Sequence, residues 1–327
     1  MKKVTVLGGG TGTFVVLSGL KNYNVDLAAV VSMMDSGGST GRLRDQLGVL
    51  PPGDLRQCLV ALSDAPLLWR KLFLYRFESG DLAGHNFGNI FLSALEKVSS
   101  SYDEVIDSAN NVLKTKGKVF PITYEKTNMC VRYESGALVK TEGNIDKNFS
   151  EKTKVIKAFL EPSVAANPKA LKRILYSDYL IIGPGDLYTS IIPILLVEGV
   201  KDVVEKAKTK IIYIMNLMTK SGQTTHYKAS DHLQDIERYL GRKPDFLILN
   251  TGNIPDSIVD WYKRANEEIV VNDINSQNFK GKTMKADLVD IREHQKPQTE
   301  KFVDPRVRSI LRHDTSKLAK VIEKLIL

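Results

Sequence analysis

The chain of 327 residues has few cysteines and no long apolar run. Its two cysteines, Cys58 and Cys130, are too few for a disulfide framework, and their spacing does not resemble a zinc site. The longest apolar candidate, Ile191 to Val200, is interrupted by Pro193 and Glu198, so it is too short to cross a bilayer. We therefore expect a protein of the reducing cytoplasm without membrane insertion.

The chain also lacks long blocks of one charge, although its formal net charge is +8. A basic chain suits anionic ligands such as nucleotides and phosphates. The lysines are dispersed, and no basic run is interleaved with aromatic residues, so we expect no nucleic-acid partner. The contents of 43% hydrophobic and 26% charged residues are typical of a globular protein.

Several strand-like apolar runs end in loops that are rich in Gly, Ser, Thr, Asp or Asn. Such runs without polar alternation are typical of parallel strands that are covered on both faces. The carboxyl ends of parallel strands meet at one edge of a sheet, where ligands bind. Four loops are therefore expected to converge on one cleft, and they begin at Gly8, Asp35, Gly183 and Asn216.

The remaining pattern indicates one α/β domain over residues 1–327. Leu67 to Phe77 has helical periodicity, and Asp54 is placed to cap the helix that follows Pro51-Pro52-Gly53. The stretch 119–160 differs, because short strand-like runs flank the hairpin signature Glu134-Ser135-Gly136. We interpret this stretch as a β-rich excursion from the main sheet.

The first glycine loop, Gly8-Gly9-Gly10-Thr11-Gly12, follows a strand and opens a helix. Glycines let the backbone approach a phosphate, and the N-terminus of the helix attracts the anion. The loop lacks the last glycine of the dinucleotide fingerprint and the Lys-Ser/Thr ending of a P-loop. A nucleotide phosphate site and a purely structural turn both remain open.

Asp35 lies just past the second strand, where a dinucleotide-binding protein places its ribose-binding carboxylate. It also opens a second glycine-rich loop, which favours a metal or substrate role at least as strongly, and an Asx-turn is the structural alternative. Arg42, Arg44 and Arg56 are candidates for gripping phosphate, or are simply exposed helix charges. His85, between glycines, is either an acid/base group or a residue that stabilises a turn.

Taken together, the loops resemble those of the YvcK branch of the CofD-like family, whose members are also called gluconeogenesis factors. The resemblance spans nearly the whole chain in order and continues through 216–224 and Asp231-His232. It is carried by Gly8 to Gly12, Asp35 to Arg44, Pro51 to Asp54, Gly84 to Asn89, Gly183 to Ser190 and Leu311 to Thr315.

This resemblance implies a three-layer α/β/α sandwich with a Rossmann-like, mostly parallel central sheet. It also implies binding of UDP-sugars, notably UDP-N-acetylglucosamine, and links to gluconeogenic growth, cell shape and cell-wall synthesis. The family's UDP-sugar contacts include a Tyr and an Arg, which map to Tyr262 and Arg312 here.

The related CofD branch transfers a phospholactyl group to a deazaflavin and uses guanosine nucleotides and magnesium. This chain departs from that pattern. Where the family has two consecutive aspartates, this chain has Asp35-Ser36. Where the family has Gln-Pro-Gly-Glu-Thr, residues 220–224 of this chain are Lys-Ser-Gly-Gln-Thr. The loss of two carboxylates weakens a magnesium site, although Asp35 and Asp54 remain candidate ligands. Both changes favour binding and regulation over catalysis.

The resulting hypothesis is a regulatory protein that binds a nucleotide sugar. A CofD-like magnesium-dependent transferase and an NAD(P)-dependent oxidoreductase are the alternatives. Asp35, Asp54 and His85 are the catalytic candidates, should there be a reaction. The sequence leaves the sugar, the protein partners, regulatory phosphorylation and the oligomeric state open, with a homodimer as one candidate. The expected ligand-binding residues are Gly9, Gly10, Thr11, Gly12, Asp35, Gly37, Gly38, Ser39, Arg42, Arg44, His85, Asn89, Gly183, Gly185, Asn216, Tyr262 and Arg312.

Overall fold

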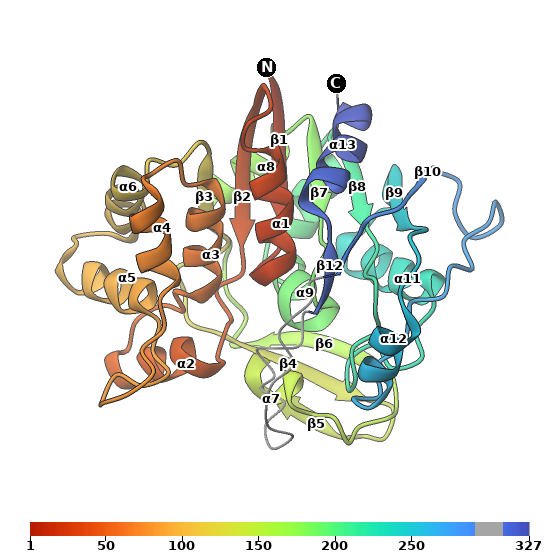
Figure 1. Ribbon diagram of the computed structural model, residues 1–327, viewed down its shortest axis with the longest axis horizontal. Helices are drawn as coiled ribbons and strands as arrows, with labels where there is room; N and C mark the ends of the chain where they lie inside the picture. The colour runs from red at the N-terminus through yellow and green to blue at the C-terminus, as the bar shows by residue number, and fades with distance from the viewer. Residues whose placement is uncertain (292–309, 327) are drawn as a thin grey trace.

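The structure is a computed structural model that describes residues 1–291 and 310–326. Within these residues, a seven-stranded sheet with the order β10-β9-β8-β7-β1-β2-β3 forms the centre of the molecule (Figure 1). Every neighbouring pair in this sheet is parallel. Its strands are β1 (Lys2–Leu7), β2 (Val25–Val31), β3 (Lys118–Pro121), β7 (Tyr179–Ile182), β8 (Lys210–Ile214), β9 (Phe246–Asn250) and β10 (Lys282–Ala286).

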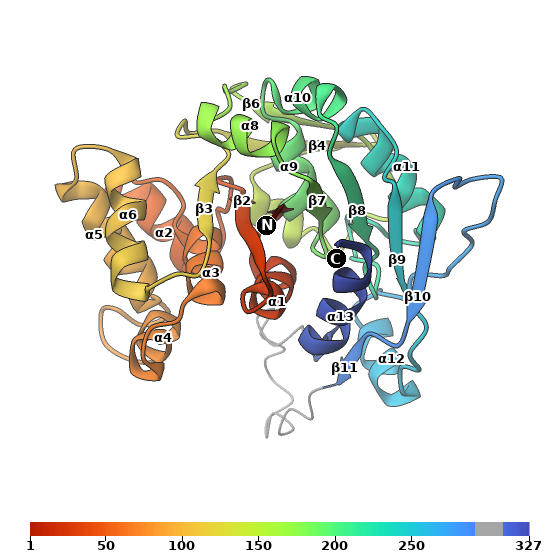
Figure 2. The ribbon, with the colours of Figure 1, turned by 90° about the horizontal axis from the view of Figure 1, so that it is seen from above.

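Helices cover both faces of the sheet, which is why its inner strands are continuous apolar runs (Figure 2). Val4, Val6 and Leu7 of β1 are all fully buried. The three-layer α/β/α sandwich predicted from the sequence is thereby confirmed. One face carries α1 (Gly10–Leu20), α3 (Gly53–Leu62) and α13 (Thr315–Ile326), and the other carries α8 (Pro168–Leu175), α9 (Ile192–Leu195), α10 (Val200–Lys206) and α11 (Ala229–Leu240).

The strand order reverses at β1. The chain builds β2 and β3 on one side of β1 and then crosses to β7 on the other side. Leu7 is in register with both Val30 of β2 and Ile182 of β7. The loops that follow β1, β2 and β7 therefore start from neighbouring points, and this reversal is where open α/β sheets bind ligands.

A group of helices extends the molecule beyond β3: α2 (Gly38–Leu47), α4 (Leu67–Leu74), α5 (Phe87–Val98) and α6 (Tyr102–Leu113) (Figures 1 and 2). The helix predicted for Leu67 to Phe77 stops earlier, at Leu74. Tyr75 is extended, and its carbonyl accepts a hydrogen bond from the Phe87 N–H at 2.9 Å. This pairing with the start of α5 replaces the last predicted helical turn.

The β-rich excursion forms a small antiparallel sheet of order β5-β4-β6, made of β4 (Asn128–Tyr133), β5 (Leu138–Lys140) and β6 (Val155–Glu161). The first residues predicted to belong to this excursion lie instead in β3, which is an edge strand of the main sheet. With α7 (Glu142–Asp146), the small sheet lies across the carboxyl ends of the main strands (Figure 1). That the chain behaves as a single domain stays a prediction.

The last described segments return to the main sheet. The hairpin of β11 (Val289–Ile291) and β12 (Leu311–His313) lies near α12 (Asp256–Lys263) and leads into α13, while a π-helical turn (Leu187–Ile191) follows β7. The amphipathic helix α13 ends the described part of the chain at Ile326, and Leu327 lies outside the described residues. No helix in the described part of the chain has the length and apolarity to cross a membrane.

Candidate functional site

A cleft of about 720 Å³ lies at the carboxyl edge of the main sheet. This volume is typical of pockets that bind small molecules. Gly10, Gly38 and Gly185, from three different loops, line the same cleft, as the converging-loop hypothesis requires. Of the residues expected at the site, the lining contains Gly9, Gly10, Thr11, Gly12, Asp35, Gly37, Gly38, Ser39, Asp54, Asn89, Gly185, Asn216, Tyr262 and Arg312.

The loops after β1 and β7 pack directly against each other at the strand-order reversal. A Cβ atom placed on Gly12 would lie 1.9 Å from the carbonyl oxygen of Pro184, so no larger residue fits. Gly10 has φ +65°, a conformation that glycine adopts without strain. These glycines therefore build the junction of the two loops as well as one wall of the cleft.

Two glycine-loop N–H groups are already hydrogen bonded to side chains of the protein. The Gly10 N–H donates to Oδ1 of Asp54 at 2.8 Å, and the Gly37 N–H donates to Oδ1 of Asp35 at 2.9 Å. Asp54 lies in the first turn of α3, and its side chain does not cap that helix, contrary to the sequence-based expectation, because it faces Gly10. A bound phosphate would have to replace these carboxylates or lie beside them.

Glu142 adds a third carboxylate to this wall, since its Oε2 accepts a hydrogen bond from the Ser36 N–H at 3.2 Å. Burial raises the pKa of Asp35, and burial together with the charge of Asp35 raises the pKa of Asp54 to about 7. The same two causes raise the pKa of Glu142 well above its usual range. Burial of the three carboxylates, together with the charge of Asp35 that acts on Asp54 and Glu142, favours a bound proton or a nearby cation.

Arg56 supplies part of the compensating positive charge. Its side chain is buried, with Nε donating to Oδ1 of Asn89 at 2.8 Å and Nη1 donating to the Phe73 carbonyl at 3.3 Å. Burial, followed by the charge of Arg76, lowers the Arg56 pKa to about 10. The guanidinium stays charged at neutral pH and is fixed in orientation at the edge of the cleft.

Four predicted ligand residues are not part of the cleft lining: Arg42, Arg44, His85 and Gly183. Arg42 donates to the Ala83 carbonyl at 3.0 Å, and Arg44 lies 3.2 Å from the neighbouring carboxylate of Asp45. The His85 ring is 3.3 Å from the hydroxyl of Ser39 and therefore supports a residue of the lining. Burial, then Arg42 and Arg76, lowers the His85 pKa.

Lys220 also lines the cleft. In the sequence it stood out only because it replaces the first residue of a family motif. Its Nζ lies 2.9 Å from Oδ1 of Asp146 in α7 and 3.6 Å from Oδ2 of Asp186 in the loop after β7. Burial opposes the charged form, but Asp186 and Asp146 outweigh it and raise the Lys220 pKa. Lys220 thus ties the small sheet to the main sheet.

Other cleft residues had no sequence motif to identify them. Glu142, Asp146 and Lys147 come from the β-rich excursion, and Arg76 comes from the segment after α4. Only the folding of the small sheet across the main strand ends brings α7 to the cleft. No spacing rule in the sequence predicts that approach.

The last wall of the cleft comes from the tail. The Tyr262 hydroxyl accepts a hydrogen bond from the Leu311 N–H at 3.4 Å, and burial raises the Tyr262 pKa to about 12. The Tyr262 ring packs edge-on against Trp261 in a small apolar cluster that also contains Leu311. Tyr262 therefore positions the strand that carries Arg312, in addition to lining the cleft itself.

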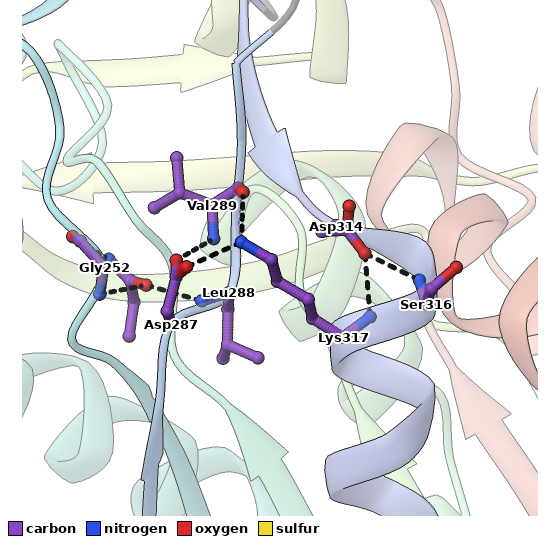
Figure 3. A network of polar contacts seen from close by, with 8 residues as sticks. Gly252, Asp287, Leu288, Val289, Asp314, Ser316 and Lys317 are labelled. Atoms are coloured by element: carbon purple, nitrogen blue, oxygen red, sulfur yellow. Dashed lines mark hydrogen bonds and ion pairs between the residues drawn. The ribbon is translucent and has the colours of Figure 1, made fainter.

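A polar network fixes this tail to the main sheet (Figure 3). Nζ of Lys317 donates to Oδ2 of Asp287 at 2.6 Å and to the Val289 carbonyl at 3.3 Å. Oδ1 of Asp314 accepts from the N–H groups of Ser316 and Lys317, at 2.9 and 2.7 Å, at the start of α13. These contacts hold β12, and with it Arg312, at the mouth of the cleft.

Fold and cleft together define an α/β protein with a mixed-charge, glycine-lined pocket at the reversal of its strand order. Residues 4–289 match the family described as 2-phospho-L-lactate transferase CofD. The chain belongs to the CofD family, as its loops predicted.

Several relatives align with almost the full length of the chain. A protein of Thermotoga maritima is 40% identical over 99% of this chain and 99% of its own. The gluconeogenesis factor of Bacillus subtilis is 36% identical over 99% of this chain and 98% of its own. A crystal structure of a UPF0052 family member from Bacillus halodurans has a TM-score of 0.88 and 34% identity, and it covers 98% of this chain and 99% of that one.

Proposed function

We propose that the chain is a regulatory protein that binds a nucleotide sugar of the UDP-N-acetylglucosamine type in the cleft. The observation that carries this proposal is that three glycine loops and the tail strand with Arg312 line one cleft. In this arrangement the glycine loops receive the diphosphate, and Arg312 adds a charge-assisted contact. The base and the sugar occupy the remaining volume of the cleft.

In this proposal, magnesium binds together with the phosphate groups of the ligand. Within residues 1–291 and 310–326, no three His, Cys, Asp or Glu side chains are grouped to hold a metal ion. Mg²⁺ is usually bound by one or two carboxylates together with phosphate oxygens and water. Asp35 and Asp54 would supply the carboxylates, and the ion would favour their charged forms, which burial disfavours in both groups and the charge of Asp35 further disfavours in Asp54.

Isothermal titration with UDP-N-acetylglucosamine, with and without magnesium, tests this function. We expect saturable binding that is stronger with magnesium and weaker for the sugar without its nucleotide. GDP- and NAD-type ligands serve as comparisons. Absence of heat at high protein concentration under both conditions would contradict the proposal.

A CofD-like transferase activity is the second candidate, and the buried carboxylate group of Asp35, Asp54 and Glu142 favours it. A carboxyl group with a pKa near neutrality is suited to proton transfer. Magnesium-dependent turnover of a nucleotide-linked phospho-substrate, lost in Asp35→Asn or Asp54→Asn, would support this activity. An NAD(P)-dependent oxidoreductase is the third candidate, and a fluorescence titration in which neither NADH nor NADPH binds would remove it.

We propose that this regulatory role lies in gluconeogenic growth, cell shape and cell-wall synthesis. The support is the family resemblance together with the name gluconeogenesis factor that the Bacillus subtilis relative carries. Growth of a deletion strain on a gluconeogenic carbon source, complemented with the intact gene and with an Arg312→Ala gene, tests this role. Equal rescue by both genes would separate the growth phenotype from ligand binding.

A further inference from the structure

Two buried polar atoms in the wall of the cleft have no hydrogen-bond partner among the residues that the structure describes. They are Oδ1 of Asn216, in the segment after β8, and Nε2 of His313 in β12. Both residues line the cleft, and His313 is only 6% exposed. A polar atom that is buried without a partner destabilises the fold, because it has lost its hydrogen bonds to water. Two such atoms in one wall indicate a partner that the chain does not supply.

The His313 ring is held beside Asn216 by the residue between that side chain and β8. The ring is hydrogen bonded to the backbone of Met215. The Met215 N–H already donates to the Ile248 carbonyl at 3.0 Å, so the group that contacts the ring is the Met215 carbonyl. Because Nε2 is the unpaired ring nitrogen, Nδ1 is the atom that donates to this carbonyl. The two unpaired atoms therefore belong to side chains that meet around Met215.

Both unpaired atoms are hydrogen-bond acceptors. Burial lowers the His313 pKa to about 4, so the ring is neutral near neutral pH and carries its single proton on Nδ1. Its Nε2 then offers a lone pair. The amide nitrogen of Asn216 donates to the Gly185 carbonyl at 2.8 Å, which directs Oδ1 away from that carbonyl. Phosphate and carbonyl oxygens cannot pair with two acceptors, whereas a ligand with two donors can.

We propose that Asn216 and His313 bind two adjacent hydroxyl groups of the ligand. This inference rests on the proposed function, in which the cleft holds a nucleotide sugar. Arg312 precedes His313 and is the expected contact of the diphosphate, and the groups attached to that diphosphate are a ribose and a sugar. Each of these carries a pair of adjacent hydroxyls and so supplies two donors. A uracil ring offers one N–H group between two carbonyl oxygens, which suits a pair of acceptors less well.

This pair of acceptors makes the cleft selective for hydroxyl-bearing ligands. A ligand that lacks one of the two hydroxyls leaves a buried acceptor unpaired, and sites built in this way reject such analogues strongly. An ordered water is the competing partner of Asn216, because a second cavity of about 40 Å³, which Asn216 also lines, has room for one. A water in that position makes ligand affinity independent of the hydroxyls.

Isothermal titration with UDP-N-acetylglucosamine and its deoxy analogues tests the proposal. One arm uses analogues that each lack one hydroxyl of the ribose, and the other arm uses analogues that each lack one hydroxyl of the sugar. We expect analogues in one arm to bind at least about tenfold more weakly than the complete ligand, and analogues in the other arm to bind nearly as well. The sensitive arm identifies which part of the ligand supplies the hydroxyls.

His313→Asn tests the assignment from the side of the protein. The Asn amide N–H can still donate to the Met215 carbonyl, whereas no atom takes the place of Nε2. We expect the complete ligand to bind about tenfold more weakly and the analogue without the facing hydroxyl to bind as it does to the unaltered chain. Asn216→Ala should show the same pattern with the analogue that lacks the other hydroxyl.

His226→Asn is the matched control, since the His226 side chain is 71% exposed and lies outside the cleft lining. Circular dichroism of each variant checks that the fold is retained. Equal affinity for the complete ligand and every deoxy analogue would overturn this inference and leave the proposed function intact. Equal weakening of the complete ligand and the deoxy analogues by His313→Asn would also overturn it, because the residue would then act only on the fold. Absence of all binding would contradict the proposed function and this inference together.

Discussion

The two walls of the cleft differ in the charged side chains that line them. The wall built by the loops after β1 and β2 and by the first turn of α3 contains Asp35 and Asp54, whose oxygens accept hydrogen bonds from glycine N–H groups. The opposite wall, built by the segment after β8 and by the tail, contributes Lys220 and Arg312. A glycine-rich loop is therefore not by itself a vacant anion site, because the protein's own carboxylates can fill it. Under the proposed function, Arg312 of the second wall supplies the positive charge that an anionic ligand requires, whereas Lys220 is already paired with Asp146 and Asp186.

Lys220→Met should have the largest effect on the protein. It leaves Asp146 and Asp186 facing each other without their shared cation, and breaking a mostly buried ion pair should lower the free energy of unfolding by about 3 kcal/mol. Urea denaturation followed by circular dichroism measures this loss. A loss no greater than that of Lys317→Met would show that Lys220 does not tie the two sheets together.

Arg312→Ala should weaken nucleotide-sugar binding about 10- to 100-fold, because a charge-assisted hydrogen bond is typically worth ~1.5–3 kcal/mol. Isothermal titration of both proteins measures the change in the dissociation constant. Arg132→Ala is the control, since Arg132 is an exposed arginine of the small sheet outside the cleft lining. Equal affinity of the Arg312→Ala protein and the unaltered chain would show that Arg312 does not contribute to ligand binding.

Asp54→Asn should change the pH dependence of stability. The folded chain raises the Asp54 pKa to about 7, from 3.8, so it keeps a proton that the unfolded chain loses above about pH 4. This contribution to stability is present at low pH and disappears as the pH rises through about 7. The Asn side chain retains an oxygen that accepts the hydrogen bond from the Gly10 N–H, and it removes the negative charge of the carboxylate.

We therefore expect Asp54→Asn to be more stable than the unaltered chain by about 1–2 kcal/mol at about pH 8, with the difference shrinking toward about pH 5. Denaturant melts over this pH range, with the exposed Asp107→Asn as control, measure the effect. A constant difference between the two proteins across the range would show that Asp54 ionises normally in the fold.

Lys317→Met should have the smallest effect. Its ion pair with Asp287 resembles that of Lys220 in geometry, but both partners are exposed to solvent, with side-chain exposures of 44% and 57%. Exposed pairs contribute little to stability, because water already solvates both charges. We expect a denaturation midpoint close to that of the unaltered chain. A large loss would mean that the network of Figure 3 governs folding of the whole tail.

Much of the fold was predictable from local patterns. The apolar runs that precede the predicted loops at Gly8 and Gly183 are β1 and β7 of the parallel sheet, because a strand buried on both faces requires such a run. The loops that follow Leu7, Val31, Ile182 and Ile214 reach one edge, since parallel strands share the direction of their carboxyl ends. Helix boundaries were less predictable, and α4 ended three residues early because Tyr75 pairs with Phe87.

The sequence by itself determined the alternation of strands and glycine loops, and hence the edge of the sheet where the cleft lies, because chain direction and backbone conformation are local properties. Only the tertiary structure decided which groups meet there. Asp54 reaches Gly10 across 44 positions of sequence, and Ser36 meets Glu142 across 106. Burial and mutual repulsion of charges act through space, so the raised pKa values and the Lys220 ion pairs exist only once these segments have come together.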